Sequence, residues 1–167
     1  VDTPGANDNA AGVAAMLAAA ELLREDALDC NLELVAFSNE EYLPIGDDTY
    51  LERRGEGFLD RVLTAINFDG PGHILDVNSL ASFTCSAEFQ AEVEAVSRAY
   101  PGVQWVEPWP QSNHSTFAMR GVPALAFSSR AIWLYSHQHD DSLRWVHPPR
   151  LVECAQLAAD IVRRMHD

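Results

Sequence analysis

LELVAFSNEE (residues 32–41) and LTAINFDGPG (63–72) are stretches of the same kind: each is a short apolar run that ends in carboxylate side chains. Apolar runs that do not alternate with polar residues are typical of strands buried on both faces of a parallel sheet. Segments with helical spacing of apolar residues alternate with these runs. The expected helices cover residues 9–24, 49–54, 86–100 and 150–164, and the expected strands cover 32–38, 63–68, 103–106 and 122–127. This alternation predicts an α/β fold with three layers, αβα, around a mostly parallel central sheet.

The length of the chain sets the number of domains. Its 167 residues suffice for one domain with a sizeable core and are too few for two ordinary ones. Neither an internal repeat nor an interdomain linker is evident, so we expect a single domain over residues 1–167. Pro123 puts the last expected strand at an edge of the sheet, or else lies among the first residues of that strand.

The acidic residues fall where such a sheet binds ligands. Ligands collect beyond the carboxyl ends of the strands, and there Glu40 and Glu41 follow the first apolar run while Asp69 follows the second. Asp8 lies in the tight loop that begins the first helix. Taken singly, such residues are usually helix caps or solvated turns. Gathered at one edge they repel each other, and a bound divalent cation is the simplest way to relieve that repulsion.

A polar loop over residues 128–147 adds His137, His139 and Asp141 to these carboxylates. Mixed histidine and carboxylate ligation suits zinc, with manganese and cobalt as less specific alternatives. Where one carboxylate of an adjacent pair binds a metal, its neighbour is held close to the metal-bound water and is a natural general base.

Composition excludes several other kinds of protein. The net charge of −14 argues against nucleic acid as a partner and favours cationic ligands such as the free amino ends of peptides, although such a charge most often serves solubility. The chain has no Lys, which excludes Schiff-base and P-loop chemistry, and no GxSxG elbow. No apolar run is long enough for a membrane span. The chain begins at Val1 and has no signal-like start, so localisation stays open, as does the oligomeric state.

The segments around these residues resemble the dizinc aminopeptidase family, which includes bacterial leucine aminopeptidases, glutamate carboxypeptidase II and animal glutaminyl cyclases. The resemblance extends over nearly the whole chain and keeps the order of the family's motifs. The matching segments are PGANDNAAGVAAML (4–17), LVAFSNEEYLPIGDDTYL (34–51), LTAINFDGPG (63–72), SNHSTFAMRGVPAL (112–125) and HQHDDSLRWV (137–146).

The resemblance implies a role for each acidic residue in a zinc-exopeptidase-like fold that hydrolyses N-terminal amino acids from peptides. Asp8 would bridge two zinc ions, and Glu40 would be the general base that deprotonates the attacking water. Glu41 and His137 would bind one metal, with His137 preferred to His139 because the family places an Asp, here Asp141, four residues after the ligand.

The resemblance also implies parts that precede Val1. Asp69 would bind the second metal together with a histidine that the family places upstream of the bridging Asp. The first strands of the sheet would likewise precede Val1.

Two departures from the family's pattern affect the active site. The family often has Tyr directly before the last ligand His, where this chain has Ser136 with Tyr135 one step further off. The family's SDH is Ser112-Asn113-His114 here. Two alternative functions stay open: acyl transfer on one zinc, as in the glutaminyl cyclases, and a non-catalytic scaffold of the same fold.

Overall fold

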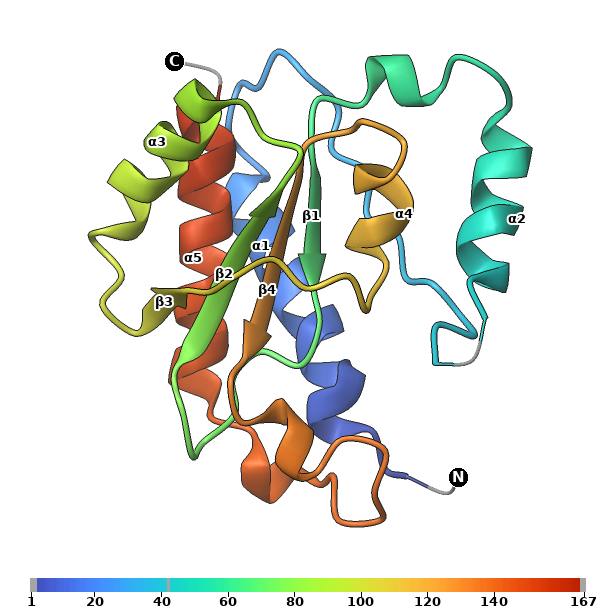
Figure 1. Ribbon diagram of the computed structural model, residues 1–167. Helices are drawn as coiled ribbons and strands as arrows, with labels where there is room; N and C mark the ends of the chain where they lie inside the picture. Colours follow the sequence, from blue (N-terminus) through green and yellow to red (C-terminus); the bar gives the residue numbers. More distant parts are fainter. Residues whose placement is uncertain (1–2, 42, 166–167) are drawn as a thin grey trace.

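The centre of the molecule is a mixed four-stranded sheet, seen in a computed structural model that describes residues 3–41 and 43–165 (Figure 1). The strand order is β1-β4-β2-β3, with the bounds Ala65–Phe68 for β1, Asn78–Phe83 for β2, Val103–Trp105 for β3 and Ala124–Ser129 for β4. β1 is parallel to β4 and β2 is parallel to β3, whereas β2 and β4 are antiparallel. The predicted mostly parallel sheet is therefore confirmed, with one antiparallel pairing at its middle.

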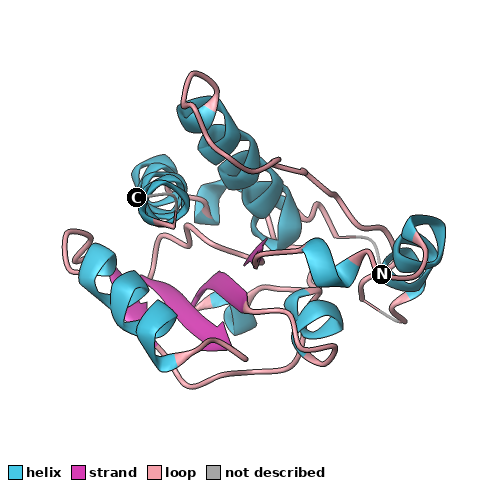
Figure 2. Ribbon diagram, turned by 90° about the horizontal axis from the view of Figure 1, so that it is seen from above, coloured by secondary structure: helices cyan, strands magenta, loops and turns pink. Residues whose placement is uncertain are grey.

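Helices on both sides of the sheet complete the three layers. Their bounds are Gly12–Leu23 for α1, Ile45–Arg54 for α2, Ala87–Ser97 for α3, His114–Ala118 for α4 and Pro148–Arg164 for α5. α1 and α5 pack against each other behind the sheet, and α4 lies against β1 and β4 on the opposite face (Figures 1 and 2). The predicted three-layer α/β fold is confirmed.

The core lies between the sheet and the pair of helices α1 and α5. Leu80, Leu125 and Phe127 from the strands meet Leu157 and Ile161 from α5, and all five are almost completely buried. Two of the helices begin at residues that suit a helix start. Prolines open α5, as expected where backbone N–H groups need no partner, and the Ser86 hydroxyl accepts a hydrogen bond from the Phe89 N–H at 3.1 Å to cap α3.

The predicted strand at residues 32–38 is wrong. Residues 31–37 have no regular secondary structure, and Leu32 and Leu34 are 45% and 49% exposed. This segment, α1 and β1 line a cavity of about 1120 Å³. A strand needs a hydrogen-bonded neighbour, and within the described residues no strand pairs with this segment or with the free edge of β1.

The other strands differ from the sequence-based expectation in two ways. Pro123 precedes β4, which lies between β1 and β2, so its alternative as an edge strand is wrong. The sequence reasoning also missed β2, whose residues NSLASF mix polar and small side chains although four of the six are buried.

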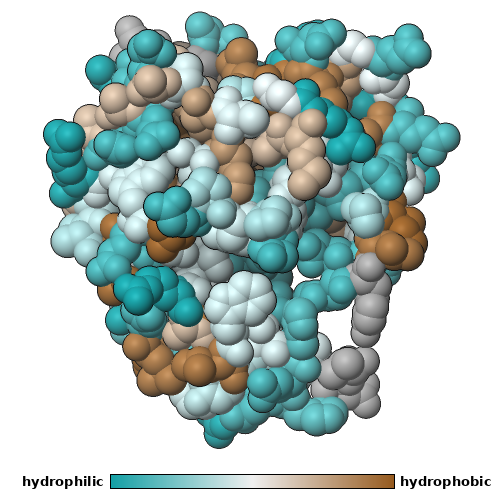
Figure 3. Space-filling view, viewed as in Figure 1, coloured by the Kyte–Doolittle hydropathy of each residue, from teal (hydrophilic) through white to brown (hydrophobic). Residues whose placement is uncertain are grey.

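The surface agrees with the acidic composition. Hydrophilic side chains cover most of the face seen in Figure 1, and apolar side chains form separate small patches (Figure 3). Among the described residues, no helix combines the length and the apolar character that crossing a membrane requires.

Candidate metal centre

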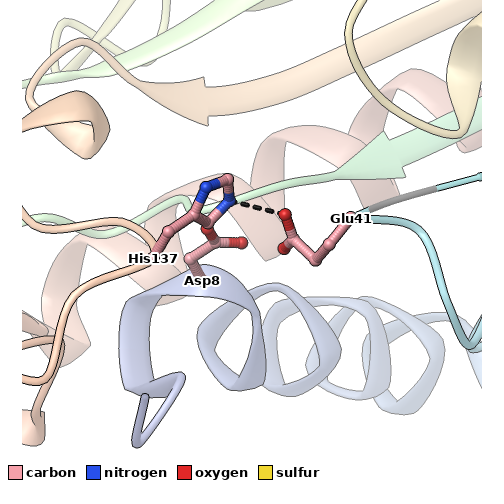
Figure 4. A group of neighbouring side chains, drawn as sticks. All are labelled: Asp8, Glu41 and His137. Atoms are coloured by element: carbon pink, nitrogen blue, oxygen red, sulfur yellow. Dashed lines mark ion pairs between the residues drawn. The ribbon is translucent and has the colours of Figure 1, made fainter. Parts of the chain in front are cut away.

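Asp8, Glu41 and His137 come together from three distant parts of the chain. One ligand atom of each lies within 4.8 Å of the others. His137 Nε2 is 2.5 Å from Glu41 Oε2 and 3.2 Å from Asp8 Oδ2 (Figure 4). The Asp8 side chain is only 7% exposed, whereas those of Glu41 and His137 are 42% and 58% exposed. The group is therefore open to solvent on one side and closed on the side of Asp8.

The local backbone explains how each residue reaches this place. Asp8 lies in an irregular turn, Ala6–Ala11, that leads into α1. Glu41 comes two residues after Asn39, which has a left-handed backbone with φ of 62°. His137 itself has φ of 60°, which is uncommon for a residue other than glycine. It lies in the loop that follows the carboxyl end of β4. The group thus sits at the carboxyl ends of the parallel pair β1 and β4, where α/β sheets bind ligands.

Asp69 lies outside this group of three but within its electrostatic reach. Burial is the main cause that raises the pKa of Asp69 to about 7. The charges of Asp8, Glu40 and Glu41 raise this pKa further, whereas a hydrogen bond from the Ser112 hydroxyl lowers it. Burial also raises the pKa of Asp8 to about 6, and the charge of Glu41 adds to that effect. These carboxylates are therefore poorly compensated by protein groups, and a cation beside them would lower both pKa values.

Glu40 is half-buried next to the group rather than in it. Burial is the main cause that raises its pKa, followed by the charges of Glu41, Asp8 and Asp47. A carboxylate whose pKa is raised holds a proton more readily near neutral pH, which is what a general base requires after it has taken a proton from water.

His139 and Asp141, which lie in the same loop as His137, have different places. His139 is exposed and is not part of the cluster that the described residues form. Asp141 is fully buried, and its carboxylate accepts hydrogen bonds from the N–H groups of Asn7 at 2.8 Å and Asp8 at 3.0 Å. Asp141 therefore orders the loop that carries Asp8.

The segment Ser112-Asn113-His114 packs against the same region. Asn67 Nδ2 donates to Ser112 Oγ at 2.8 Å, and Ser112 in turn donates to Asp69. Asn113 Nδ2 lies 2.9 Å from both carboxylate oxygens of the buried Asp47. His114 is buried with its Nε2 2.7 Å from the Trp109 carbonyl oxygen, and burial lowers its pKa. His114 is thus a neutral packing residue, whereas Ser112 contacts a candidate ligand.

Tyr135 is committed to packing. Its ring stacks on Trp145 at 3.9 Å between centroids and on the buried His73 at 5.7 Å. Tyr135 is half-buried in this stack.

Asn9 is a site residue that the sequence reasoning missed. Its side chain contacts the backbone on both sides of Asp69, at Phe68 O and Gly70 N. Asparagine is common where a helix begins, and Asn9 Oδ1 does accept the Gly12 N–H at 3.1 Å, so its residue type alone did not single it out.

Several known proteins that resemble this chain are named as aminopeptidases. The chain is 24% identical to the aminopeptidase YwaD of Bacillus subtilis over an alignment of 171 positions. The alignment covers 96% of the chain and 37% of that protein. Its structure resembles that of an aminopeptidase from Aneurinibacillus sp. strain AM-1 with a TM-score of 0.83 and 25% identity, over 97% of the chain and 40% of that protein. A zinc aminopeptidase from Bacillus subtilis, BSAP, has the same fold with a TM-score of 0.82 and 22% identity, over 98% and 42% of the two chains.

The chain thus spans about two-fifths of the length of these relatives. The pattern of one peptidase family matches residues 1–162, which is nearly the whole chain. Fold and family pattern agree with the predicted resemblance: the chain belongs to peptidase family M28.

Proposed function

We propose that this chain carries most of the active site of a zinc-dependent exopeptidase that removes N-terminal amino acids from peptides. The convergence of Asp8, Glu41 and His137, with ligand atoms within 4.8 Å of one another, is the observation on which the proposal rests. Family membership supports it, because the relatives are named as aminopeptidases.

The three side chains fit a zinc ion chemically. Zinc in catalytic sites takes histidine nitrogen and carboxylate oxygen from the protein and keeps one position for water or substrate. Asp8 and Glu41 place two negative charges close together, and burial raises the pKa of Asp8 to about 6. A divalent cation would supply the counter-charge that these carboxylates lack. Asp69, with a histidine from outside residues 1–167, would hold a second zinc. Manganese and cobalt are alternatives for the same ligands.

Glu40 is assigned to proton transfer. Zinc, when bound, acts as a Lewis acid and lowers the pKa of a water molecule. Glu40 lies half-buried beside the ligands, takes the proton of the attacking water, and passes it to the leaving amine. Its raised pKa suits both steps, since the group must accept and then release a proton within one turnover.

The substrate is a peptide with a free N-terminus. The site gathers Asp8, Glu40, Glu41 and Asp69, and this excess of negative charge attracts an α-ammonium group. Asp8, Glu41 and Asp69 line the cavity of about 1120 Å³, and the other residues that line it set the side-chain specificity.

Zinc uptake and peptidase activity test the proposal. The purified chain, prepared without chelator, should contain zinc or gain it on titration, and the Asp8→Asn and His137→Ala variants should lose it. A longer protein that includes the upstream sequence should release amino acids from aminoacyl-p-nitroanilides. A chain that takes up no Zn²⁺, Mn²⁺ or Co²⁺ would contradict the metal site.

Acyl transfer on a single zinc is the second candidate. The observation that favours it is that Asp69 is absent from the group formed by the described residues Asp8, Glu41 and His137, which suffices for one metal. An assay that measures both amino acid release and pyroglutamate formation from N-terminal glutamine separates the two reactions.

A further inference from the structure

Asn9 joins three elements of the site through one side-chain amide. Its Nδ2 donates to the Phe68 carbonyl oxygen at 2.8 Å. Its Oδ1 accepts from the Gly70 N–H at 3.0 Å and from the Gly12 N–H at 3.1 Å. Phe68 ends β1, Gly70 begins the loop after it, and Gly12 is in the first turn of α1.

The amide replaces a neighbouring strand at the end of β1. The Asp69 N–H donates to the Phe127 carbonyl oxygen at 2.8 Å and so continues the pairing with β4. In an extended chain, the carbonyl before a residue and the N–H after it point away from that residue's own N–H. Phe68 O and Gly70 N therefore face the free edge of β1, and Asn9 supplies one donor and one acceptor in the register of a strand.

The consequence concerns the two carboxylates of the site. Asp8 is covalently next to Asn9, and Asp69 lies between the two backbone groups that Asn9 binds. We propose that Asn9 is a positioning residue that sets the placement of Asp69 relative to Asp8, and so tunes metal affinity. The proposal rests on the proposed function, because it assumes that a metal binds at Asp8.

The close approach of α1 to β1 supports this role. A Cβ atom at Gly12 would lie 2.1 Å from Asn9 Oδ1 and 2.4 Å from the Phe68 carbonyl oxygen. No larger residue fits between α1 and the end of β1, so the geometry around the amide is tightly constrained. Because this region is so tightly packed, loss of the Asn9 hydrogen bonds should shift the segments that carry Asp8 and Asp69.

Asn78 provides a matched control. It is fully buried, its Oδ1 accepts from the Gly72 N–H at 2.8 Å, and its Nδ2 donates to the Arg150 carbonyl oxygen at 2.9 Å. Asn78 thus makes the same kind of two-sided backbone contact without adjoining a candidate ligand. Asn9→Leu and Asn78→Leu both remove such contacts with little change in volume.

The test measures Co²⁺ affinity and urea stability for the wild-type chain and its variants. Co²⁺ titration followed by visible absorption should give a loss of ~10-fold or more in affinity for Asn9→Leu, the usual range for groups that orient a metal ligand. Asn78→Leu should lower stability and leave Co²⁺ affinity unchanged. Asn9→Ser adds no charge, keeps a short hydroxyl acceptor and loses the amide donor to Phe68, so its affinity should lie between those of Asn9→Leu and the wild type.

Each other outcome counts against the inference. Unchanged Co²⁺ affinity in Asn9→Leu, or an equal loss in Asn78→Leu, overturns the role of Asn9 and leaves the proposed function standing. A wild-type chain that takes up no Co²⁺ overturns the metal site itself and the inference with it. If Asn9→Leu does not fold, the uncharged Asn9→Ser decides: weaker Co²⁺ binding than in the wild type supports the role, and equal or tighter binding overturns it.

Discussion

The Asp141 carboxylate holds the backbone of Asp8, a residue 133 positions away in the sequence, by accepting its N–H at 3.0 Å. The same carboxylate accepts the Asn7 N–H at 2.8 Å, and the Ala6 N–H donates to the Asp141 carbonyl oxygen at 3.2 Å. The loop that carries His137 is thus fastened to the turn that carries Asp8, and the two candidate ligands are held together even without a metal.

Asp141→Asn should destabilise the chain. An amide can offer only one acceptor oxygen, so one buried N–H loses its partner and the other loses a charged one. Hydrogen bonds to charged groups contribute ~1.5–3 kcal/mol each, and we expect a loss of that size in the free energy of unfolding. Urea denaturation measures it. Asp140→Asn is the control: its exposed ion pair with Arg144 should contribute less than ~1 kcal/mol. Equal effects of the two changes would contradict this role for Asp141.

Gly12→Ala should be more harmful than its position in a helix suggests. In most helices this change is favourable by up to ~1 kcal/mol. Here the new Cβ would overlap Asn9 Oδ1 and the Phe68 carbonyl oxygen, so α1 must move away from β1. We expect a loss of ~1–3 kcal/mol, as for other overpacked sites. Thermal unfolding measures it, with Ala14→Ser at an exposed position of α1 as the control. A stabilised Gly12→Ala would show that the two elements separate easily.

The sequence predicts the fold where the pattern is local. The apolar spacing of α5 with its two opening prolines, the Ser86 cap of α3 and the apolar runs of β1 and β4 all lead to the observed elements. Residues 31–37 show where a local pattern fails, because a β-strand depends on a partner strand and none in the described part of the chain pairs with this segment. β2 was missed for the opposite reason: its pairing with both β4 and β3 makes a strand of a sequence with weak strand propensity.

The sequence pointed to the residue types of the site at the strand ends, but not to the hydrogen bonds that connect them. Asp8, Glu41 and His137 were expected together and lie together. The ties made by Asn9 and Ser112 were not expected, since a hydrogen bond between residues 59 or 45 positions apart leaves no periodic signal in one sequence. Such ties depend on how the finished elements approach each other.

The two members of the glutamate pair should fail in different ways. Glu40→Gln removes the proton acceptor and keeps the metal ligands, so we expect zinc content to persist while the rate falls by ~10²–10⁴-fold. Glu41→Gln removes a ligand atom that lies 2.5 Å from His137 Nε2, so zinc content should fall first, and excess zinc should restore part of the activity. Metal analysis in parallel with an aminoacyl-p-nitroanilide assay of the longer protein separates the two. The reverse pattern would exchange their roles.

Asp8 and Asp69 should make the metal-free chain more stable as the pH falls from about 7.5 to about 5.5, against the opposite contribution of the buried His73 and His114, whose pKa values burial lowers. Burial raises the pKa of Asp8 to about 6 and that of Asp69 to about 7, from 3.8 for both. Between the ordinary and the raised pKa values, the folded state binds more protons than the unfolded state, so acidification favours folding. One pKa unit corresponds to ~1.4 kcal/mol, and a gain of at least ~1 kcal/mol should raise the melting temperature by ~2–4 °C.

Zinc should oppose this pH dependence. A bound metal requires deprotonated carboxylates, so zinc binding competes with protons, and the stabilisation that zinc gives should shrink as the pH falls through about 6. Melting temperatures of the metal-free and zinc-loaded chain, each measured from about pH 7.5 to about pH 5.5, should therefore converge toward acid. An Asp8→Asn/Asp69→Asn double variant has neither titrating group and should flatten the rise seen without metal. If that rise is as steep in the double variant as in the wild type, it originates from other groups, and Asp8 and Asp69 do not control how the stability of this chain depends on pH.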